Sequence, residues 1–201
     1  MTPLRESQLV EAHRAGDPDA LGELLAGYQK RVYSICYRMI RDDQNAKDLT
    51  QDSLIRIIEK LDTYDGRARL STWVIRIAMN VCLSHLRRER LRRHAPLEAP
   101  GSDQIEPRGT EGEPSPASRV EQAEMKQILL QAMDAIDPQM RSMIVLRDMQ
   151  GLDYHRIGEV LEIPVGTVKS RLFRARAALR DAANVEMGAR TNSVRSGQGA
   201  Q

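Results

Sequence analysis

The chain has 201 residues, so it can hold one or two small domains, each long enough to bury a core of its own. Charged residues make up 29% and aromatic residues 3%, which favours helices packed through aliphatic side chains over a strand-rich fold. Nothing resembles a signal peptide or an apolar span of about 18 residues, so we expect a cytoplasmic protein that does not insert into a membrane.

Two helices are expected in the first 41 residues. Ser7 is a plausible cap of the first, and Asp17 followed by Pro18 is a start signal for the second, which repeats apolar residues with a period near 3.6. Cys36 and Cys82 lie in apolar helical runs without a Cys-x-x-Cys pair or a histidine at ligand spacing. We therefore expect reduced core thiols, with no metal site and no other cofactor.

A third helix is expected from residue 42 to residue 61. Its apolar positions share one side, and we place Ile58 on that buried side together with Leu54 and Ile57. The opposite side combines acids with a single exposed isoleucine. Its candidate binding residues are Asp48, Gln51, Asp52, Ile55 and Glu59.

Three interpretations of that acidic face remain open. Carboxylates one helical turn apart can ligate Mg²⁺ in a nuclease, although such sites usually draw acids from several elements. The face can also be merely solvated. An apolar residue ringed by like charges is, however, the pattern of an interface, so we favour a docking surface for a basic partner.

Residues 63–69 are expected to form a loop with two projecting arginines, and a long helix should follow, capped by Ser71 and running to about Arg93. Trp73 is expected to anchor its buried stripe. The next stripe round that helix offers hydrogen-bond donors at a spacing that can follow a phosphate backbone, unless it is a solvated ridge. These candidate DNA contacts of the loop and helix are Arg67, Arg69, Arg76, Asn80, Ser84, Arg87, Arg88 and Arg92.

Residues 95–118 are rich in Pro, Gly, Ser and Glu, which predicts a flexible acidic linker. An amphipathic helix from residue 119 to residue 135 should follow, with Asp137 capping the next helix. Two final helices, from Tyr154 to Leu161 and from about Pro164 onward, are separated by a tight turn and form a helix-turn-helix pattern. Beyond Asn184 the composition predicts a disordered tail.

The last helix buries one apolar stripe and shows an opposite face without any acid between Gly166 and Arg180. Small residues at its start and arginines along its length suit insertion into the major groove, although a basic solvated helix of a small bundle would look similar. Its candidate DNA contacts are Thr167, Lys169, Ser170, Arg171, Phe173, Arg174 and Arg176.

Three motifs together resemble the extracytoplasmic-function (group 4) sigma factors of bacterial RNA polymerase. Residues 46–52 (AKDLTQD) are similar to the family's region 2.2, residues 72–80 (TWVIRIAMN) with Arg87-Arg88 to regions 2.3 and 2.4, and residues 164–176 (PVGTVKSRLFRAR) to its sigma-4 helix-turn-helix. Leu54, Ser84 and Asp137 depart from the residues usual at their positions.

The resemblance implies an all-α chain with a sigma-2 domain at residues 5–94, a linker at 95–118, a sigma-4 domain at 119–184 and a tail at 185–201. It implies binding to core RNA polymerase through the β′ clamp helices and the β flap, and recognition of the minus-ten and minus-thirty-five promoter elements. It also implies an anti-sigma factor and a role in a stress or envelope response, without catalysis by the chain itself.

Three further expectations concern single segments. In related proteins the loop before the minus-ten helix forms a pocket for a flipped base, and residues 65–71 occupy that place. The acidic linker is expected to mimic nucleic acid inside a polymerase channel. The rival interpretation of the whole chain is a stand-alone helix-turn-helix regulator, which would not bind core polymerase.

Overall fold

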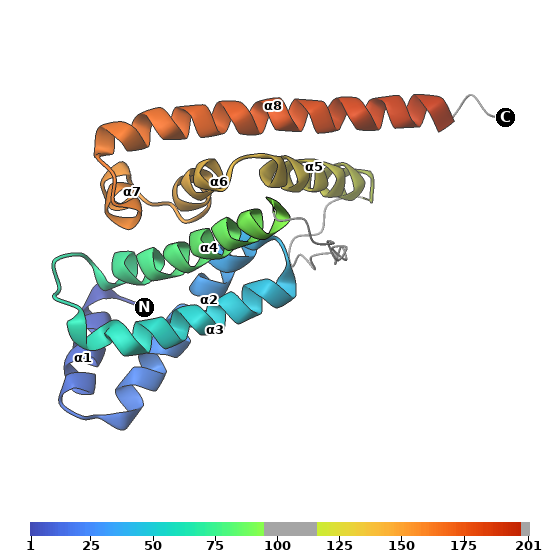
Figure 1. Ribbon diagram of the computed structural model, residues 1–201. Coiled ribbons are helices and arrows are strands. Elements are labelled where there is room, and N and C mark those ends of the chain that lie inside the picture. Colours follow the sequence, from blue (N-terminus) through green and yellow to red (C-terminus); the bar gives the residue numbers. More distant parts are fainter. Residues whose placement is uncertain (95–115, 198–201) are drawn as a thin grey trace.

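The computed structural model describes residues 1–94 and 116–197, and every regular element within these ranges is helical (Figure 1). The first range folds into α1 (Pro3–Arg14), α2 (Pro18–Ile40), α3 (Asp43–Lys60), the short 3-10 helix η1 (Leu61–Thr63) and α4 (Leu70–His94). The second folds into α5 (Pro116–Ala135), α6 (Pro138–Ile144), the π-helix η2 (Val145–Met149), α7 (Tyr154–Leu161) and α8 (Val165–Gly197). The prediction of an all-α chain with two helical parts is confirmed.

Short polar side chains start most of these helices, because they accept hydrogen bonds from backbone N–H groups that have no partner inside the helix. Asp17 accepts from the amide of Asp19, and Asp137 accepts from that of Gln139, as the sequence predicts. The predicted caps Ser7 and Ser71 are wrong. Thr2 caps α1 with Pro3 at its first position, so Ser7 lies inside the helix, and α4 begins before Ser71, at Leu70.

Helix α4 lies at the centre of the molecule, between α2 and α3 on one side and α6 and α7 on the other (Figure 1). Its buried positions therefore extend round more of its surface than the single predicted stripe. Val74, Ala78 and Val81 are buried on one side of the helix and Ile75, Met79 and Cys82 on the next, whereas the predicted anchor Trp73 is only partly buried. Cys36 of α2 and Cys82 are free buried thiols, as expected.

The helix-turn-helix is formed by α7, a turn at residues 162–164, and α8. Glu162 ends α7 in the left-handed conformation with φ 55°, and the amide of Ile163 donates to the carbonyl of Gly158 at 3.0 Å. A Cβ atom on Gly158 would lie 2.9 Å from the carbonyl oxygen of Ile163, so close packing of the turn requires glycine there. The predicted buried stripe of α8 is confirmed, with Val168, Leu172 and Ala175 inside.

The two helical parts pack against each other in this structure and share a continuous apolar core. Buried Arg141 of α6 donates to the carbonyl of Met39 at the end of α2 at 2.6 Å, and also to the carbonyl of Asp134 at 3.1 Å. Arg31 of α2 donates to the Gln150 side chain at 3.1 Å, and Arg76 of α4 lies 3.6 Å from the Glu162 carboxylate. Polar contacts therefore flank the apolar contact between the parts.

Two predicted boundaries differ from the structure. Residues 116–118, predicted as the end of the linker, already belong to α5, and the rest of the predicted linker falls within residues 95–115, outside the described ranges. Residues 185–197 were predicted as a disordered tail, but they continue α8. This run follows directly on a helix that packs on α5, and extending an existing helix avoids the cost of nucleating a new one.

Candidate functional site

The acidic side of α3 is the first of four candidate surfaces, and we call it the α3 face. All five of its predicted residues are exposed, including Ile55 at 53%. Ile58 is also 42% exposed, although the sequence placed it on the buried side. It lies three residues after Ile55 and hence on the neighbouring ridge of the helix, a spacing that could have revealed it. The α3 face thus presents two adjacent isoleucines among carboxylates.

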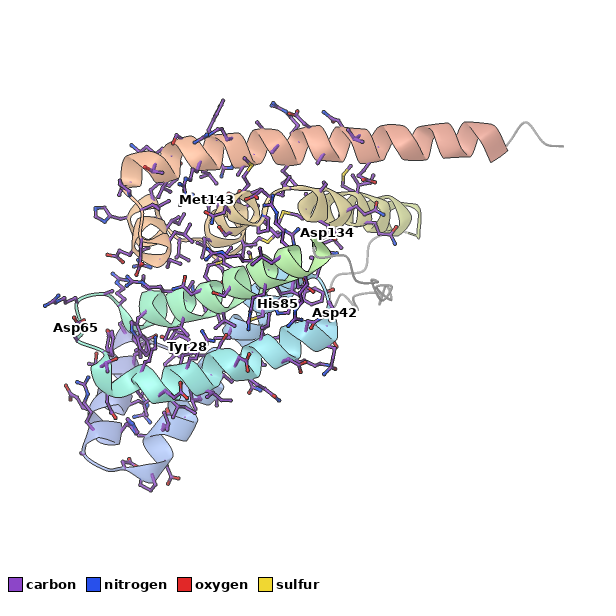
Figure 2. All side chains as sticks on the ribbon, in the orientation of Figure 1. Tyr28, Asp42, Asp65, His85, Asp134 and Met143 are labelled. Atoms are coloured by element: carbon purple, nitrogen blue, oxygen red, sulfur yellow. The ribbon has the colours of Figure 1, made fainter. Side chains whose placement is uncertain are left out.

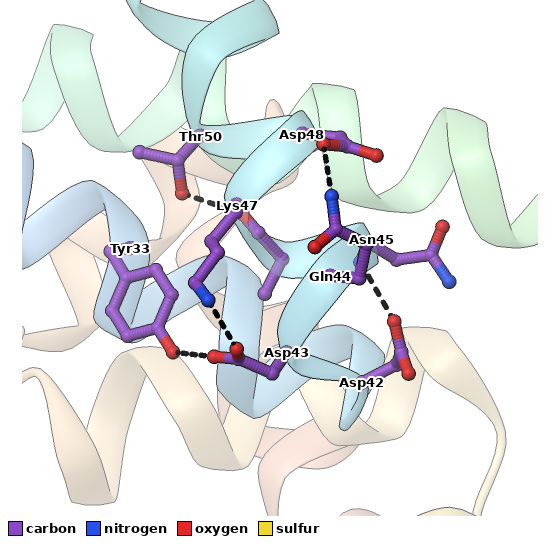
Figure 3. Close-up of polar contacts among 9 residues, drawn as sticks. Tyr33, Asp42, Asp43, Gln44, Asn45, Lys47, Asp48 and Thr50 are labelled. Atoms are coloured by element: carbon purple, nitrogen blue, oxygen red, sulfur yellow. Dashed lines mark hydrogen bonds and ion pairs between the residues drawn. The ribbon is translucent and has the colours of Figure 1, made fainter. Parts of the chain in front are cut away.

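The start of α3 is fixed by several polar contacts (Figure 3). Asp42 accepts from the amide of Asn45 at 2.7 Å, and Asp43 bridges the Tyr33 hydroxyl and the Lys47 ammonium group. Lys47 and then Tyr33 lower the pKa of the Asp43 carboxyl. Asp43 is thus already engaged within the protein, whereas the exposed Asp48, held only by Gln44 in Figure 3, can still meet a partner.

The second surface is the predicted row of donors on α4, which we call the α4 ridge: Arg76, Asn80, Ser84, Arg87, Arg88 and Arg92. The last five are exposed. Arg76 is different, since its side chain is only 29% exposed and faces Glu162 of the helix-turn-helix. A cavity of about 200 Å³ between α3 and α4 places Arg88 beside Asp48 and Asp52. The structure therefore brings the ridge next to the α3 face.

The third surface is a cavity of about 260 Å³ between the loop before α4 and helix α1, which we call the loop pocket. Gly66, with φ 74°, makes the turn of the loop. The Tyr64 hydroxyl donates to the carbonyl of Ala68 at 2.6 Å, and the Tyr64 ring packs 5.5 Å from that of Trp73. Burial, followed by the charges of Glu6 and Asp65, raises the pKa of Tyr64. The predicted Arg67 and Arg69 line the pocket and are exposed.

The fourth surface is the exposed side of α8, which we call the basic face. Lys169, Ser170 and Arg174 are exposed, and Phe173, at 76%, is the most exposed large apolar side chain in the described ranges. Thr167 and Arg171 are half-buried at its edges. Its outward arginines and hydroxyls can reach base edges and phosphates of a duplex.

Arg176, also predicted on the basic face, forms an ion pair with Asp148 of η2 that is made of two hydrogen bonds. These bonds raise the pKa of Arg176. The π-helix is closed by the amide of Gln150, which donates to the carbonyl of Val145 at 2.9 Å. The sequence did not predict this irregular turn or the ion pair that it supports.

A further apolar surface was not predicted. Helix α5 packs on α8, and both carry exposed apolar residues: Met125 and Leu129 on α5, and Val185 and Met187 on α8. Exposed apolar residues on two packed helices are typical of a protein interface.

Side chains that carry nitrogen or oxygen are spread widely over the molecule (Figure 2). In the described ranges, no three histidine, cysteine or acidic side chains meet at metal-binding distances. The acids of the α3 face lie along one helix, not around a point. None of the helices within these ranges is both long enough and apolar enough to cross a bilayer.

Two segments match known families. Residues 24–92 match Sigma-70 region 2, and residues 126–179 match Sigma-70, region 4. The chain is 32% identical over 177 residues to the ECF RNA polymerase sigma factor SigW of Bacillus subtilis, covering 85% of this chain and 92% of the relative. It is 32% identical over 178 residues to the ECF RNA polymerase sigma-E factor of Escherichia coli K12, covering 88% and 93%.

Two solved structures share the fold. One is the sigma factor RpoE of Bartonella quintana in complex with the anti-sigma factor NepR, with a TM-score of 0.65 and 23% identity over 83% of this chain and 98% of that one. The other is CnrH in complex with the cytosolic domain of CnrY, with a TM-score of 0.61 and 21% identity over 91% and 97%.

Proposed function

The chain belongs to the extracytoplasmic-function group of RNA polymerase sigma factors, and from this premise we propose how its four surfaces divide the work of transcription initiation. The α3 face docks on the clamp helices of the polymerase β′ subunit. The α4 ridge and the loop pocket engage the minus-ten element, and the basic face of α8 reads the minus-thirty-five element. The polymerase supplies the chemistry.

The observation that carries the proposal is the composition of the α3 face. Ile55 and Ile58 are exposed on neighbouring ridges of one helix, at 53% and 42%, among exposed acids. Burying this pair against a partner is favourable, and the carboxylates complement a basic surface. A sigma factor needs such a surface before it meets any promoter.

Co-purification with core polymerase tests this assignment. The double variant Asp48→Lys with Asp52→Lys should lose binding to core polymerase without DNA, because it repels a basic partner. A matched double variant at exposed acids elsewhere, Glu11→Lys with Glu159→Lys, should bind as the wild type does. Equal binding by both double variants would refute the α3 face as the docking surface, and no binding by the wild type would favour a stand-alone regulator.

The other assignments rest on position and charge. The exposed arginines of the loop pocket and α4 ridge suit single-stranded or duplex phosphates, and those of α8 suit the major groove. The apolar surface on α5 and α8 suits the β flap. Because Arg76 is paired with Glu162 in this compact arrangement, the two helical parts must move apart before the ridge can contact DNA along its full length.

An anti-sigma factor is proposed as a further partner. Of the two solved structures that share the fold, one is a complex with the anti-sigma factor NepR and the other a complex with the cytosolic domain of CnrY. An inhibitor that covers the α3 face would compete with the polymerase for the same exposed isoleucines. A role in a stress or envelope response is proposed on the family resemblance. The cytoplasm, where polymerase works, is the proposed location.

A further inference from the structure

A buried acid in the wall of the loop pocket has no role in the assignments above. Glu6 lies on α1, outside the segment that matches Sigma-70 region 2, yet it lines the cavity together with Arg67 and Arg69. It is only 8% exposed. Carboxylates are rarely buried to this extent unless a cation pairs with them, and an acid is an unexpected group in a pocket for DNA.

Three of the nearby cations are engaged elsewhere. Arg5 pairs with Glu23, Arg67 with Asp65, and Arg14 donates to the backbone carbonyl of Tyr64. In the described ranges Glu6 forms no ion pair. The buried Tyr28 hydroxyl is near enough to sense this carboxylate, since the pKa of Tyr28 is raised first by burial and then by Glu6, but it makes no hydrogen bond of good geometry. The Glu6 carboxylate therefore retains acceptor capacity.

The pocket around Glu6 is formed before any ligand arrives. Within the loop, the Tyr64 hydroxyl donates a hydrogen bond to the carbonyl of Ala68, and the Tyr64 ring packs on Trp73 of α4. Arg14 of α1 donates a hydrogen bond to the carbonyl of Tyr64. His13 lies 3.8 Å from Asp62 at the loop's beginning. A rigid wall that carries an acceptor can discriminate between ligands, because a ligand without a matching donor leaves the carboxylate buried and unsatisfied.

We propose that Glu6 makes the loop pocket selective for an extruded base that bears an exocyclic amine, and that it rejects thymine; the inference rests on the proposed minus-ten role of this pocket. An ionised carboxylate only accepts hydrogen bonds. Cytosine, adenine and guanine each offer an amine, whereas thymine presents two carbonyl oxygens on either side of one N–H. Arg67 and Arg69 contact the adjoining phosphates.

Short single-stranded probes test the inference without knowledge of the promoter. The full chain, reconstituted with bacterial core RNA polymerase, is titrated with two fluorescent 12-mers. One contains thymidine alone, and the other has a single deoxycytidine at its centre. Because the strand can slide along the protein, the experiment does not require knowing which nucleotide enters the pocket. The wild type should bind the cytosine probe about tenfold more tightly, the size expected of one good contact to a base edge. Replacing that cytosine by 2-pyrimidinone, which lacks the amine, should remove the preference.

Variants separate a specificity role from a structural one. Glu6→Gln can donate to the O4 atom of thymine, so the ratio of the two dissociation constants should fall to about one. Glu6→Asp keeps the charge but moves the carboxylate away from the base, because the side chain is shorter. It should lower the ratio of the two dissociation constants part of the way to one. The matched control Glu11→Gln, at an exposed position of α1, should leave the ratio unchanged. Thermal unfolding of each variant shows whether the fold is retained.

The outcomes are distinguishable. A wild-type complex that binds both probes equally, or a folded Glu6→Gln variant that keeps the cytosine preference, overturns the role of Glu6 and leaves the proposed function standing. A wild-type complex that forms with core polymerase but binds neither probe contradicts the minus-ten role of the loop pocket, and this inference falls with it.

Discussion

Gly158 shows how a single atom decides whether the helix-turn-helix can close. The residue is buried, and any Cβ atom there would press on the Ile163 carbonyl oxygen in the turn. We expect Gly158→Ala to lower the free energy of unfolding by about 1–3 kcal/mol, the usual cost of overpacking, although alanine is the better helix former. Urea denaturation followed by circular dichroism measures the change.

Gly22 supplies the matched control for this substitution. It is also inside a helix, α2, but it is exposed and a Cβ atom there would meet nothing within 4 Å. Gly22→Ala should therefore be neutral or stabilise the protein by up to about 1 kcal/mol. Two alanine variants with equal stability would show that the turn yields to accommodate the methyl group.

Residues that act through local rules were the predictable ones. The caps Asp17 and Asp137, for example, follow from neighbouring prolines. Arg141 was not predictable in this way, because its partner, the carbonyl of Met39, is brought close only by the packing of the two helical parts. The role of Glu6 was not predictable either, because the pocket that it lines is formed with a loop that lies far along the chain.

Helix α8 allows the division between base reading and phosphate binding to be measured. Both Arg174 and Lys169 are exposed on the basic face. Arg174→Ala should cost about 1–3 kcal/mol at the cognate promoter and relax one base position. Lys169→Ala should weaken all sequences evenly and lower the salt slope by about one unit. Holoenzyme titrations with cognate and random DNA at several salt concentrations test this, and indistinguishable effects of the two changes would refute it.

Helix α3 carries a second element-scale prediction. Ile58→Ser should weaken binding to core polymerase by about 1–3 kcal/mol, because the apolar contact of the α3 face extends to this residue. Competition against the wild type for limiting core polymerase measures the loss. Ile57→Ser would instead unfold the domain, since Ile57 is buried. If Ile58→Ser competes as well as the wild type, the apolar contact with core polymerase does not extend from Ile55 to Ile58.

The helices themselves were largely predictable, whereas the faces they bury were predictable only in part. A period near 3.6 identifies α2, α3, α7 and α8 because each has one apolar stripe. Helix α4 has neighbours on two sides, so its sequence carries more apolar positions than one stripe explains. The π-helix has no such signature, because its pattern of hydrogen bonds depends on the helices around it.

At the scale of the whole molecule, the packing of the two helical parts covers one end of the α4 ridge, so that this end cannot contact DNA. Glu162→Arg would place a second guanidinium group beside Arg76, so an ion pair worth up to about 1 kcal/mol becomes a repulsion of similar size. We expect the open population to grow on the order of tenfold. Energy transfer between dyes at exposed Gln44 and Asn184 measures the separation, with Glu159→Arg on α7 as the matched control.

An unchanged separation in Glu162→Arg would show that the apolar contact between α4 and α7 sets the arrangement without help from this ion pair. Separation of the parts in the control variant as well would point to a general effect of added positive charge on the helix-turn-helix. Only a selective response identifies the Arg76 contact as part of what holds the parts together.

Promoter-directed transcription by a reconstituted holoenzyme tests the central claim most directly. The purified chain is added to core polymerase together with a library of bacterial promoter fragments, and the 5′ ends of the transcripts are mapped. We expect RNA to start at a small set of shared positions, and the Asp48→Lys, Asp52→Lys double variant to abolish these starts. Transcripts that begin at the same scattered positions with and without the chain would contradict its role as a sigma factor.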